Sequence, residues 1–315
     1  MNSRQLARAW PYPRFKQFAK SMRTTAADWF EEKGYSVHPS MPYCLDKWDN
    51  WKNNIILPEV ADYIERVKSD SQKLKRPFPL NKYVYHGLSS QAMLFNLVGP
   101  LIVTDDLEPL RQVVYQQGIE WPGGVSTASF EYEDREVFNE DAAQPTSIDL
   151  VINDGFGNPK LFIESKFVES EFGRCSVLDA GDCDGSNHMD NLSRCYLHFI
   201  DRSYWEKLND NRFAPLLESE TFCVFGMYYQ FFRELIMALV KGGSFILLFD
   251  ERSPVFYCKV SNVERGVLPF LKKFVPNDYH RRYGFITVKQ LVQSIKQSGR
   301  HSWITEFERK YGLTA

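Results

Sequence analysis

Apolar and polar residues alternate in two arms of the chain, residues 147–153 and 160–167. Alternation with a period of two is typical of β-strands that bury one face. Between the arms, residues 154–159 read Asp-Gly-Phe-Gly-Asn-Pro, a composition typical of a turn. The pattern therefore predicts a β-hairpin, whose buried faces carry Ile148, Leu150 and Ile152 in the first arm and Leu161, Ile163, Ser165 and Phe167 in the second.

The opposite faces of the two arms carry charge. Asp149 lies on that face of the first strand, and Glu164 and Lys166 lie on it in the second. A loop from residue 154 to 158 or 159 pairs Asn153 with Lys160, and therefore Asp149 with Glu164. Directly opposed side chains have Cβ atoms about 5 Å apart, where like charges destabilise a sheet. We therefore expect a positive group between the carboxylates, either a divalent metal ion or the Lys166 ammonium.

Apolar periodicity, capping residues and prolines predict the other elements. The expected helices lie at 1–35, 58–74, from 89 or 90 to an interruption or kink at Pro100, 108–117, 190–210, 222–241, 261–273, 288–298 and 302–311. The expected strands lie at 127–134, 147–153, 160–168, 244–249 and 284–287, and residues 36–55 and 173–190 are expected to be loops. Around the hairpin the order is helix–strand–strand–strand–helix–strand, which predicts an α/β fold.

The segments Thr146-Ser147-Ile148-Asp149 and Glu164-Ser165-Lys166 resemble the motif of the PD-(D/E)XK phosphodiesterase superfamily, the fold of many restriction and repair nucleases. Ile148 stands where the proline of the family name would be, a common departure in the superfamily. Three further segments resemble a bacterial group of restriction-endonuclease-like proteins: residues 86–97, 129–133 and 228–235. The resemblance covers roughly residues 80 to 250.

This resemblance implies a restriction-endonuclease-like core, a mixed central sheet flanked by helices in the order αβββαβ. We expect that core at residues 81–260. A helical N-terminal extension would precede it at 1–80, and a C-terminal α/β extension packed on the core would follow at 261–315.

The resemblance also implies the chemistry of the site. Asp149 and Glu164 would hold Mg²⁺ or Mn²⁺, with the backbone carbonyl of Ser165 as a further ligand, because strand carbonyls serve so in the family. Lys166 would orient or deprotonate the attacking water. A lysine beside two carboxylates has a raised pKa, the wrong direction for a base, so that role depends on the metal.

Three more residues are candidates by the same resemblance. Glu131 shares a strand face with Glu133 and is the candidate for a second acid on the metal side; the alternative is the solvated side of an edge strand. Gln230 and Arg233 lie one helical turn apart, and such residues often lie near the scissile phosphate in the family. The alternative for them is a buried hydrogen-bonded pair.

Four residues in the loop after the hairpin have side chains that bind metals. Cys175, Cys183, His188 and Cys195 could hold a structural Zn²⁺, since zinc accepts three thiolates and one imidazole. An iron–sulfur cluster is an alternative, as some relatives of the superfamily carry one. Ordinary unligated thiols are the third reading. Cys44, Cys223 and Cys258 lie in apolar contexts and are read as core residues.

The amino-acid composition limits which partners this chain can bind. The net charge of −2 means that contact with nucleic acid requires local basic patches. One such stretch, residues 1–27, carries Arg4, Arg8, Arg14 and Lys16 among aromatic residues; the alternative is an amphipathic helix packed on the core. No window approaches the ~20 apolar residues of a membrane span, and the N-terminus lacks the apolar stretch of a signal peptide. We therefore expect a cytoplasmic protein with reduced cysteines and no membrane contact.

Together these features predict a metal-dependent phosphodiesterase of a bacterial cell, acting on DNA, double-stranded rather than single-stranded, as an endonuclease rather than an exonuclease. Whether the protein forms a homodimer is a question that the sequence leaves open. One alternative is a catalytically inactive nuclease-fold module that binds nucleic acid or a protein partner. Another is a general α/β scaffold with an accidental motif, which would have no cleft around Asp149, Glu164 and Lys166.

Overall fold

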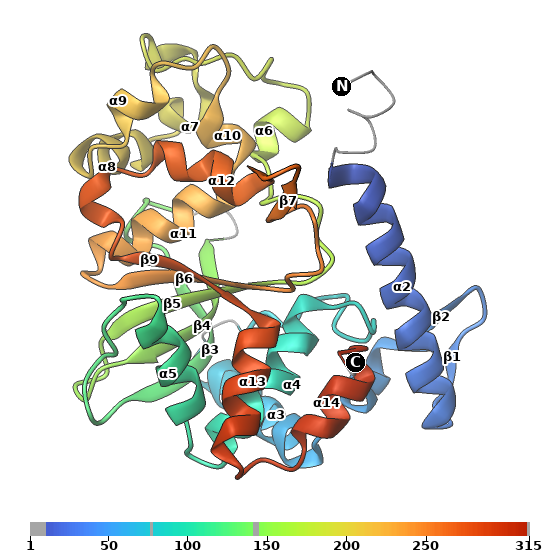
Figure 1. The fold of residues 1–315 in the computed structure, drawn as a ribbon. Helices are drawn as coiled ribbons and strands as arrows, with labels where there is room; N and C mark the ends of the chain where they lie inside the picture. Colours follow the sequence, from blue (N-terminus) through green and yellow to red (C-terminus); the bar gives the residue numbers. More distant parts are fainter. Residues whose placement is uncertain (1–10, 76–77, 141–144, 314–315) are drawn as a thin grey trace.

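The centre of the molecule is a mixed β-sheet (Figure 1). In the computed structural model, which describes residues 11–75, 78–140 and 145–313, its strands lie in the order β3-β4-β5-β6-β9. The pairs β3–β4 and β4–β5 are antiparallel, whereas β5–β6 and β6–β9 are parallel. The prediction of an α/β fold with a mixed sheet flanked by helices is confirmed. The strands are β3 (Thr127–Asp134), β4 (Thr146–Asn153), β5 (Pro159–Lys166), β6 (Ser244–Phe249) and β9 (Tyr283–Thr287).

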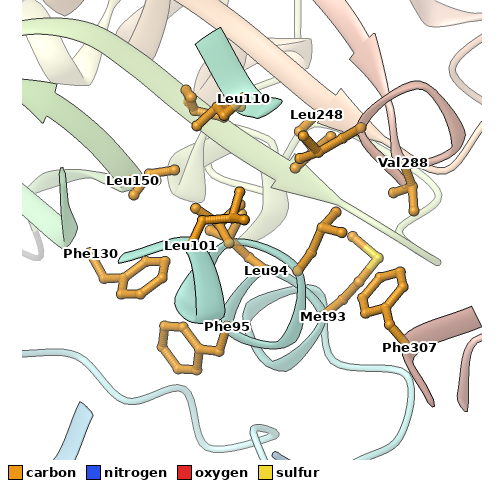
Figure 2. Close-up of a cluster of buried hydrophobic side chains, with 14 of the residues drawn as sticks. Met93, Leu94, Phe95, Leu101, Leu110, Phe130, Leu150, Leu248, Val288 and Phe307 are labelled. Carbon is orange, nitrogen blue, oxygen red and sulfur yellow. The ribbon is translucent and has the colours of Figure 1, made fainter. Parts of the chain in front are cut away.

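One face of the sheet is covered by a layer built around α4 (Ser90–Val103), a helix with almost no polar face. Figure 2 shows Met93, Leu94 and Phe95 of α4 packed against residues of the strands and of later helices. The same hydrophobic cluster draws side chains from helices far apart in sequence, namely α2 (Pro11–Glu32), α3 (Pro58–Lys73), α5 (Glu108–Gln116), α13 (Val288–Ser298) and α14 (Ile304–Lys310).

The other face is covered by a second cluster around α11 (Tyr229–Val240), which packs on β4, β5 and β6. Alternate strand residues divide between the two clusters: Ile163 and Leu248 face α4, whereas Phe162 and Leu247 face α11. The shorter helices on this side are α6 (Ser176–Asp179), α7 (Tyr196–Phe199), α8 (Tyr204–Asp210), α9 (Ala214–Leu217), α10 (Val224–Met227) and α12 (Val267–Leu271).

Local signals explain several helix boundaries. Ser89 caps α4, because its Oγ accepts a hydrogen bond from Ala92 N at 3.2 Å. Thr287 and Gln290 form a reciprocal capping box at the start of α13, which ends at Gly299 with φ 67°. The helix α4 continues through Pro100 to Val103, so of the predicted interruption or kink the interruption is wrong, and the kink stays a prediction.

The structure also contains two small hairpins in segments that the sequence pattern assigned otherwise. The pair β1 (Val37–His38) and β2 (Met41–Leu45) lies where a loop was predicted. The pair β7 (Cys258–Val260) and β8 (Val263–Arg265) replaces the start of the helix predicted at 261–273. Ser261 and Asn262 form its two-residue turn with φ 48° and 62°, the left-handed conformation that such hairpins require.

The helix predicted at 190–210 is interrupted. It is divided into η2 (Leu192–Arg194), α7 and α8, with Asp201 at φ 59° between the last two. At the other end of the chain, β9 joins the central sheet beside β6, and α14 packs between α2 and α4. The three-part division of the chain stays a prediction. None of the helices in the described residues has the length and apolar character of a membrane span.

Candidate active site

The β4–β5 hairpin brings the two predicted carboxylates together. The register pairs Ile152 with Leu161 and Leu150 with Ile163, which leaves Asp149 next to Glu164 at the following position. Asp149 is partly buried, and its Oδ2 accepts a hydrogen bond from the backbone N–H of Ser165 at 2.8 Å. This amide hydrogen bond holds the Asp149 side chain against the strand that carries Glu164.

The register differs from the expectation only at the turn. Asn153 pairs with Pro159 rather than Lys160, because an irregularity lies between Ile152 and Asn153. Within the turn, Asp154 Oδ1 accepts from the backbone N–H groups of Phe156 and Asn158, each at 2.9 Å. The tight loop is thus closed by Asp154, and the irregularity restores the predicted pairing further along the strands.

Lys166 lies at the centre of a short hydrogen-bonded network. Its Nζ donates to Glu164 Oε1 at 2.7 Å and to Gln230 Oε1 at 2.9 Å. Gln230 Nε2 donates in turn to the same Glu164 oxygen at 2.7 Å. Both charged side chains are buried, with 3% of Glu164 and 6% of Lys166 exposed. The structure therefore brings three predicted residues, from β5 and the first turn of α11, into direct contact.

Glu131 joins this group from β3 through an unusual backbone conformation. It lies between the pairs Phe130–Leu150 and Tyr132–Ile148, beside Asp149, with φ 58°. A left-handed residue inside a strand is rare for any residue but glycine, and such strain concentrates at functional sites. This conformation of Glu131 reverses the alternation of side chains along β3. Phe130 therefore packs on the α4 side of the sheet, whereas Tyr132 packs on the α11 side.

The buried Glu131 side chain is held by α4. Its Oε1 accepts a hydrogen bond from Gln91 Nε2 at 2.5 Å. Gln91 is itself fixed, because its Oε1 accepts from Asn81 N and its Nε2 also donates to Pro79 O. The helix α4 thus contributes to the site through the Gln91 amide, which orients the Glu131 acid on β3.

Glu234 is a further acid of the site that sequence reasoning missed. It lies one helical turn after Gln230 on α11, is 1% exposed, and its Oε2 has no hydrogen-bond partner among the described residues. The signal that could have found it is a single acid inside the apolar run Phe231–Val240, four positions after Gln230.

The electrostatics of the site follow from this crowding of acids. Burial raises the pKa of Asp149, and the neighbouring Glu164 raises it further. Burial also raises the pKa of Glu131, and the charge of Asp149 raises it further. The pKa of Glu234 is raised in the same way by burial and by Glu164. For Lys166, burial alone would lower the pKa, but Glu164 and Glu234 outweigh it and hold the pKa above its ordinary value.

The side chains are of the kind that binds a hard divalent cation through one or two carboxylates, although among the described residues no three of these acids bring an oxygen within 4.8 Å of one another. Four neighbouring carboxylates meet here: Glu164, Glu234 and Asp149 act on the ammonium of Lys166, and Glu131 lies beside Asp149. Buried acids in excess over buried bases are costly unless a cation neutralises them. Oxygen ligands of this type are those that Mg²⁺ binds. Ser165, whose side chain is fully buried, lies between the two hairpin acids.

A cleft of about 710 Å³ opens beside this acidic cluster. Gln230 and Glu234 belong to both the cleft wall and the cluster, so they connect the buried charges to the cleft. The remaining wall includes basic and aromatic side chains, among them Arg174, Arg202, Tyr196, Tyr204 and Tyr229.

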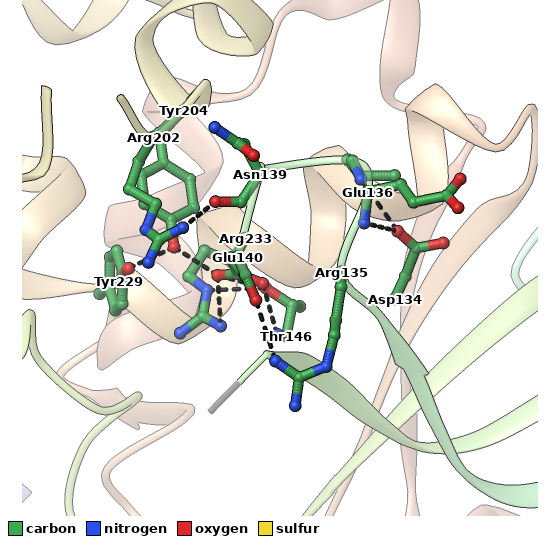
Figure 3. A network of polar contacts seen from close by, with 11 residues as sticks. Asp134, Arg135, Glu136, Asn139, Glu140, Thr146, Arg202, Tyr204, Tyr229 and Arg233 are labelled. Carbon is green, nitrogen blue, oxygen red and sulfur yellow. Dashed lines mark hydrogen bonds and ion pairs between the residues drawn. The ribbon is translucent and has the colours of Figure 1, made fainter. Parts of the chain in front are cut away.

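Arg233 also lines the cleft but points away from Lys166. Its Nε donates to Thr146 Oγ1 at 2.8 Å, and its Nη2 lies 2.8 Å from Glu140 Oε1 (Figure 3). Glu140 is 2% exposed and also accepts from Thr146 N and Tyr204 Oη. The guanidinium lies 4.5 Å from the centre of the Tyr229 ring. The two residues predicted on this helix therefore belong to different networks: Gln230 contacts the acidic cluster, and Arg233 contacts Thr146 and Glu140.

The predicted basic stretch is described only in part. Arg4 and Arg8 lie outside the described residues, as does the side chain of Arg14. Lys16 is exposed on α2, while Phe18 and Met22 of the same helix are buried in the core. The helix is therefore amphipathic, as the alternative reading expected, and it presents at least one lysine of the stretch to solvent.

Comparison with known families adds an independent observation. A family model described as "Restriction Endonuclease associating with ARP" matches residues 23–312. The chain belongs to this family. The match spans the acidic cluster, the cleft and most of the helices on both faces of the sheet, and it confirms the restriction-endonuclease-like resemblance. Comparison with curated proteins and with solved structures gave no match.

Proposed function

We propose that this member of the restriction endonuclease family is a metal-dependent nuclease that cleaves double-stranded DNA internally. The observation that carries the proposal is the cluster of acids beside Lys166, next to an open cleft. Family membership supports a nuclease, and Gln230, which contacts both Glu164 and Lys166, also lines the cleft.

Each residue has a part in the proposed reaction. Asp149 and Glu164 hold Mg²⁺ or Mn²⁺, aided by Ser165 and Glu131. When bound, the metal ion stabilises negative charge on the phosphate and lowers the pKa of a water molecule. Lys166 positions the attacking water through its Nζ, and Gln230 and Glu164 keep that ammonium in place by hydrogen bonds at 2.9 and 2.7 Å.

The cleft suits a nucleic acid. Arg174 and the half-exposed ring of Tyr196 line it, which offers a cation for a phosphate and an aromatic face for a base or sugar. In this proposal the backbone passes along the cleft and the scissile phosphate reaches the acidic cluster past Gln230 and Glu234.

The test is a cleavage assay on the purified full chain. Supercoiled plasmid, linear duplex, single-stranded DNA and RNA are each incubated with Mg²⁺, Mn²⁺, Ca²⁺ or EDTA. We expect nicked and linear plasmid with Mg²⁺ or Mn²⁺, and no cleavage in EDTA. Asp149→Asn and Lys166→Ala should lower the rate by about 10²–10⁴-fold while duplex binding persists, because these groups act in the transition state.

A matched control is Asp62→Asn, which makes the same change at an exposed carboxylate on α3. That variant should cleave like the wild type. Cleavage in EDTA, or an active Asp149→Asn variant, would overturn the proposed site. Duplex binding without cleavage under any of these metals would instead support a binding module.

A further inference from the structure

A second cavity, separate from the acidic cluster, collects four cysteines. It has a volume of about 350 Å³ and is lined by Cys175, Cys183, Cys195 and Cys223, together with His188. All four thiols are free. They come from distant positions: Cys175 precedes α6, Cys183 lies in the following loop, Cys195 precedes α7 and Cys223 precedes α10. The fold has therefore gathered thiols from about fifty residues of chain.

All four cysteines line this one cavity, and two of them are close neighbours. Gly226 lies between two of them, since a Cβ added there would lie 3.1 Å from Cys223 Sγ and 3.7 Å from Cys175 Cβ. Sequence reasoning placed Cys223 in the core; the structure packs it, partly buried, against the α11-side cluster, where it also lines this cavity.

Backbone amides donate to two of the sulfur atoms that line the cavity. The backbone N–H of Gly185 donates to Cys183 Sγ at 3.4 Å, and that of Gly226 donates to Cys223 Sγ at 3.2 Å. Hydrogen bonds of this kind to sulfur are a feature of thiolate metal centres. Without a cation, four thiolates in one buried site would repel one another. The thiols would therefore lose their protons only when they bind a metal.

His188 provides an independent sign of a missing ligand. It lines the same cavity, is 9% exposed, and its Nδ1 has no hydrogen-bond partner among the described residues. A donor atom of His188 lies within 4.8 Å of both Cys183 and Asp184. A buried ring nitrogen without a partner is costly, and a metal centre would satisfy it.

The spacing of the sulfurs favours a cluster over a single ion. Thiolates bound to one zinc at about 2.3 Å lie at most about 4.6 Å apart. Among the described residues, no three of these thiols lie within 4.8 Å of one another. A cluster of several iron ions holds its four thiolates further apart than a single ion does, and the cavity offers room for it.

We propose that Cys175, Cys183, Cys195 and Cys223 bind an iron–sulfur cluster, with His188 beside it. The centre would order the wall of the cleft, because Val177, Tyr196 and Leu197 line both the cysteine cavity and the cleft. Its role is structural in this proposal, and no electron transfer is required.

The experiment measures metal, so it does not depend on nuclease activity. The full chain is purified without oxygen, and its iron, acid-labile sulfide and zinc are counted per chain, together with the visible absorbance. We expect iron and sulfide in equal amounts and a brown protein. The single variants Cys175→Ser, Cys183→Ser, Cys195→Ser and Cys223→Ser should each lose most of the iron.

Cys44→Ser and Cys258→Ser are matched controls, because both cysteines are buried but lie outside this cavity. They should keep the iron of the wild type. One zinc per chain in place of iron would overturn the cluster, and wild-type protein free of both metals after anaerobic reconstitution would overturn the centre. The metal content of the wild-type protein tests the proposal even if a serine variant fails to fold.

Discussion

The side-chain amide of Gln230 bridges Lys166 and α11, because its Oε1 accepts a hydrogen bond from Lys166 Nζ at 2.9 Å. The same amide donates to Glu164 at 2.7 Å, so one residue fixes both members of the motif on β5. An amide suits this position because it can accept from the ammonium and donate to the carboxylate simultaneously.

Replacing Gln230 with leucine should therefore slow cleavage without preventing folding. We expect a loss of about 10–100-fold in rate, the usual effect of removing a group that orients metal ligands. Initial rates on supercoiled plasmid at saturating Mg²⁺ measure it. Gln293→Leu, at an exposed position of α13, is the control and should leave the rate unchanged. An unaltered rate for Gln230→Leu would mean that Lys166 functions without its hydrogen bond to Gln230.

Much of this site follows from local sequence rules. The alternation and turn of residues 147–167 predict the hairpin and place Asp149 beside Glu164, since a period of two and a short loop leave few registers. Gln230 joins the site as the family resemblance implies. The hairpin depends on neighbours in sequence, which is why a pattern can reveal it, whereas the long-range contact of Gln230 was expected only from the resemblance.

The parts that were missed depend on tertiary packing. Glu234 and Cys223 both lie in apolar sequence, and only the folded chain shows that they face a charged cluster and a thiol-lined cavity. The strain at Glu131 is also invisible in sequence, because a glutamate carries no preference for a left-handed conformation. The small hairpins were missed because strands of two to five residues give too few alternating positions.

Glu234 should make stability depend on pH and metal. Its pKa is raised in the folded protein, so the folded state binds more protons than the unfolded chain above about pH 4. Stability from this group therefore falls as the pH rises through the raised pKa. In EDTA, Glu234→Gln should be more stable than the wild type at pH 8 by about 1–3 kcal/mol, and the difference should shrink towards pH 4.

Urea unfolding at several pH values measures this difference. Mg²⁺ should stabilise the wild type more at pH 8 than at pH 5, because Glu131 and Asp149 also have raised pKa values and bind the cation only when ionised. Glu59→Gln, at an exposed acid on α3, should show neither effect. A metal stabilisation that is independent of pH would argue against carboxylate ligands.

Arg233 should matter for stability because of Glu140. Removing one partner of a buried ion pair leaves the other charge uncompensated. We expect Arg233→Met to lower the free energy of unfolding by about 3–5 kcal/mol. Arg111→Met, which breaks the exposed pair with Glu108 on α5, should cost less than about 1 kcal/mol. A stable Arg233→Met protein that has lost cleavage would instead place this guanidinium on the substrate.

The helix α2 packs beside the end of β5 that carries Lys166. The Phe18 ring packs edge-on against Phe167 with centroids 6.2 Å apart, and Phe167 directly follows Lys166. Lys16 and Lys20 are exposed on this helix, while Phe18 between them is buried. A duplex held at the acidic cluster could thus lie against the exposed lysines of α2.

Reversing both lysines, Lys16→Glu with Lys20→Glu, should weaken duplex binding and flatten its salt dependence. Each lost phosphate contact removes about 0.9 from the slope of log affinity against log salt, so two contacts remove about 1.8. Fluorescence anisotropy of a labelled duplex over a range of KCl concentrations gives the slope. Lys259→Glu with Lys289→Glu makes the same charge change at exposed positions of β7 and α13. If both pairs lower the slope equally, the effect is one of net charge; if neither changes it, α2 serves only to pack its apolar face on the core.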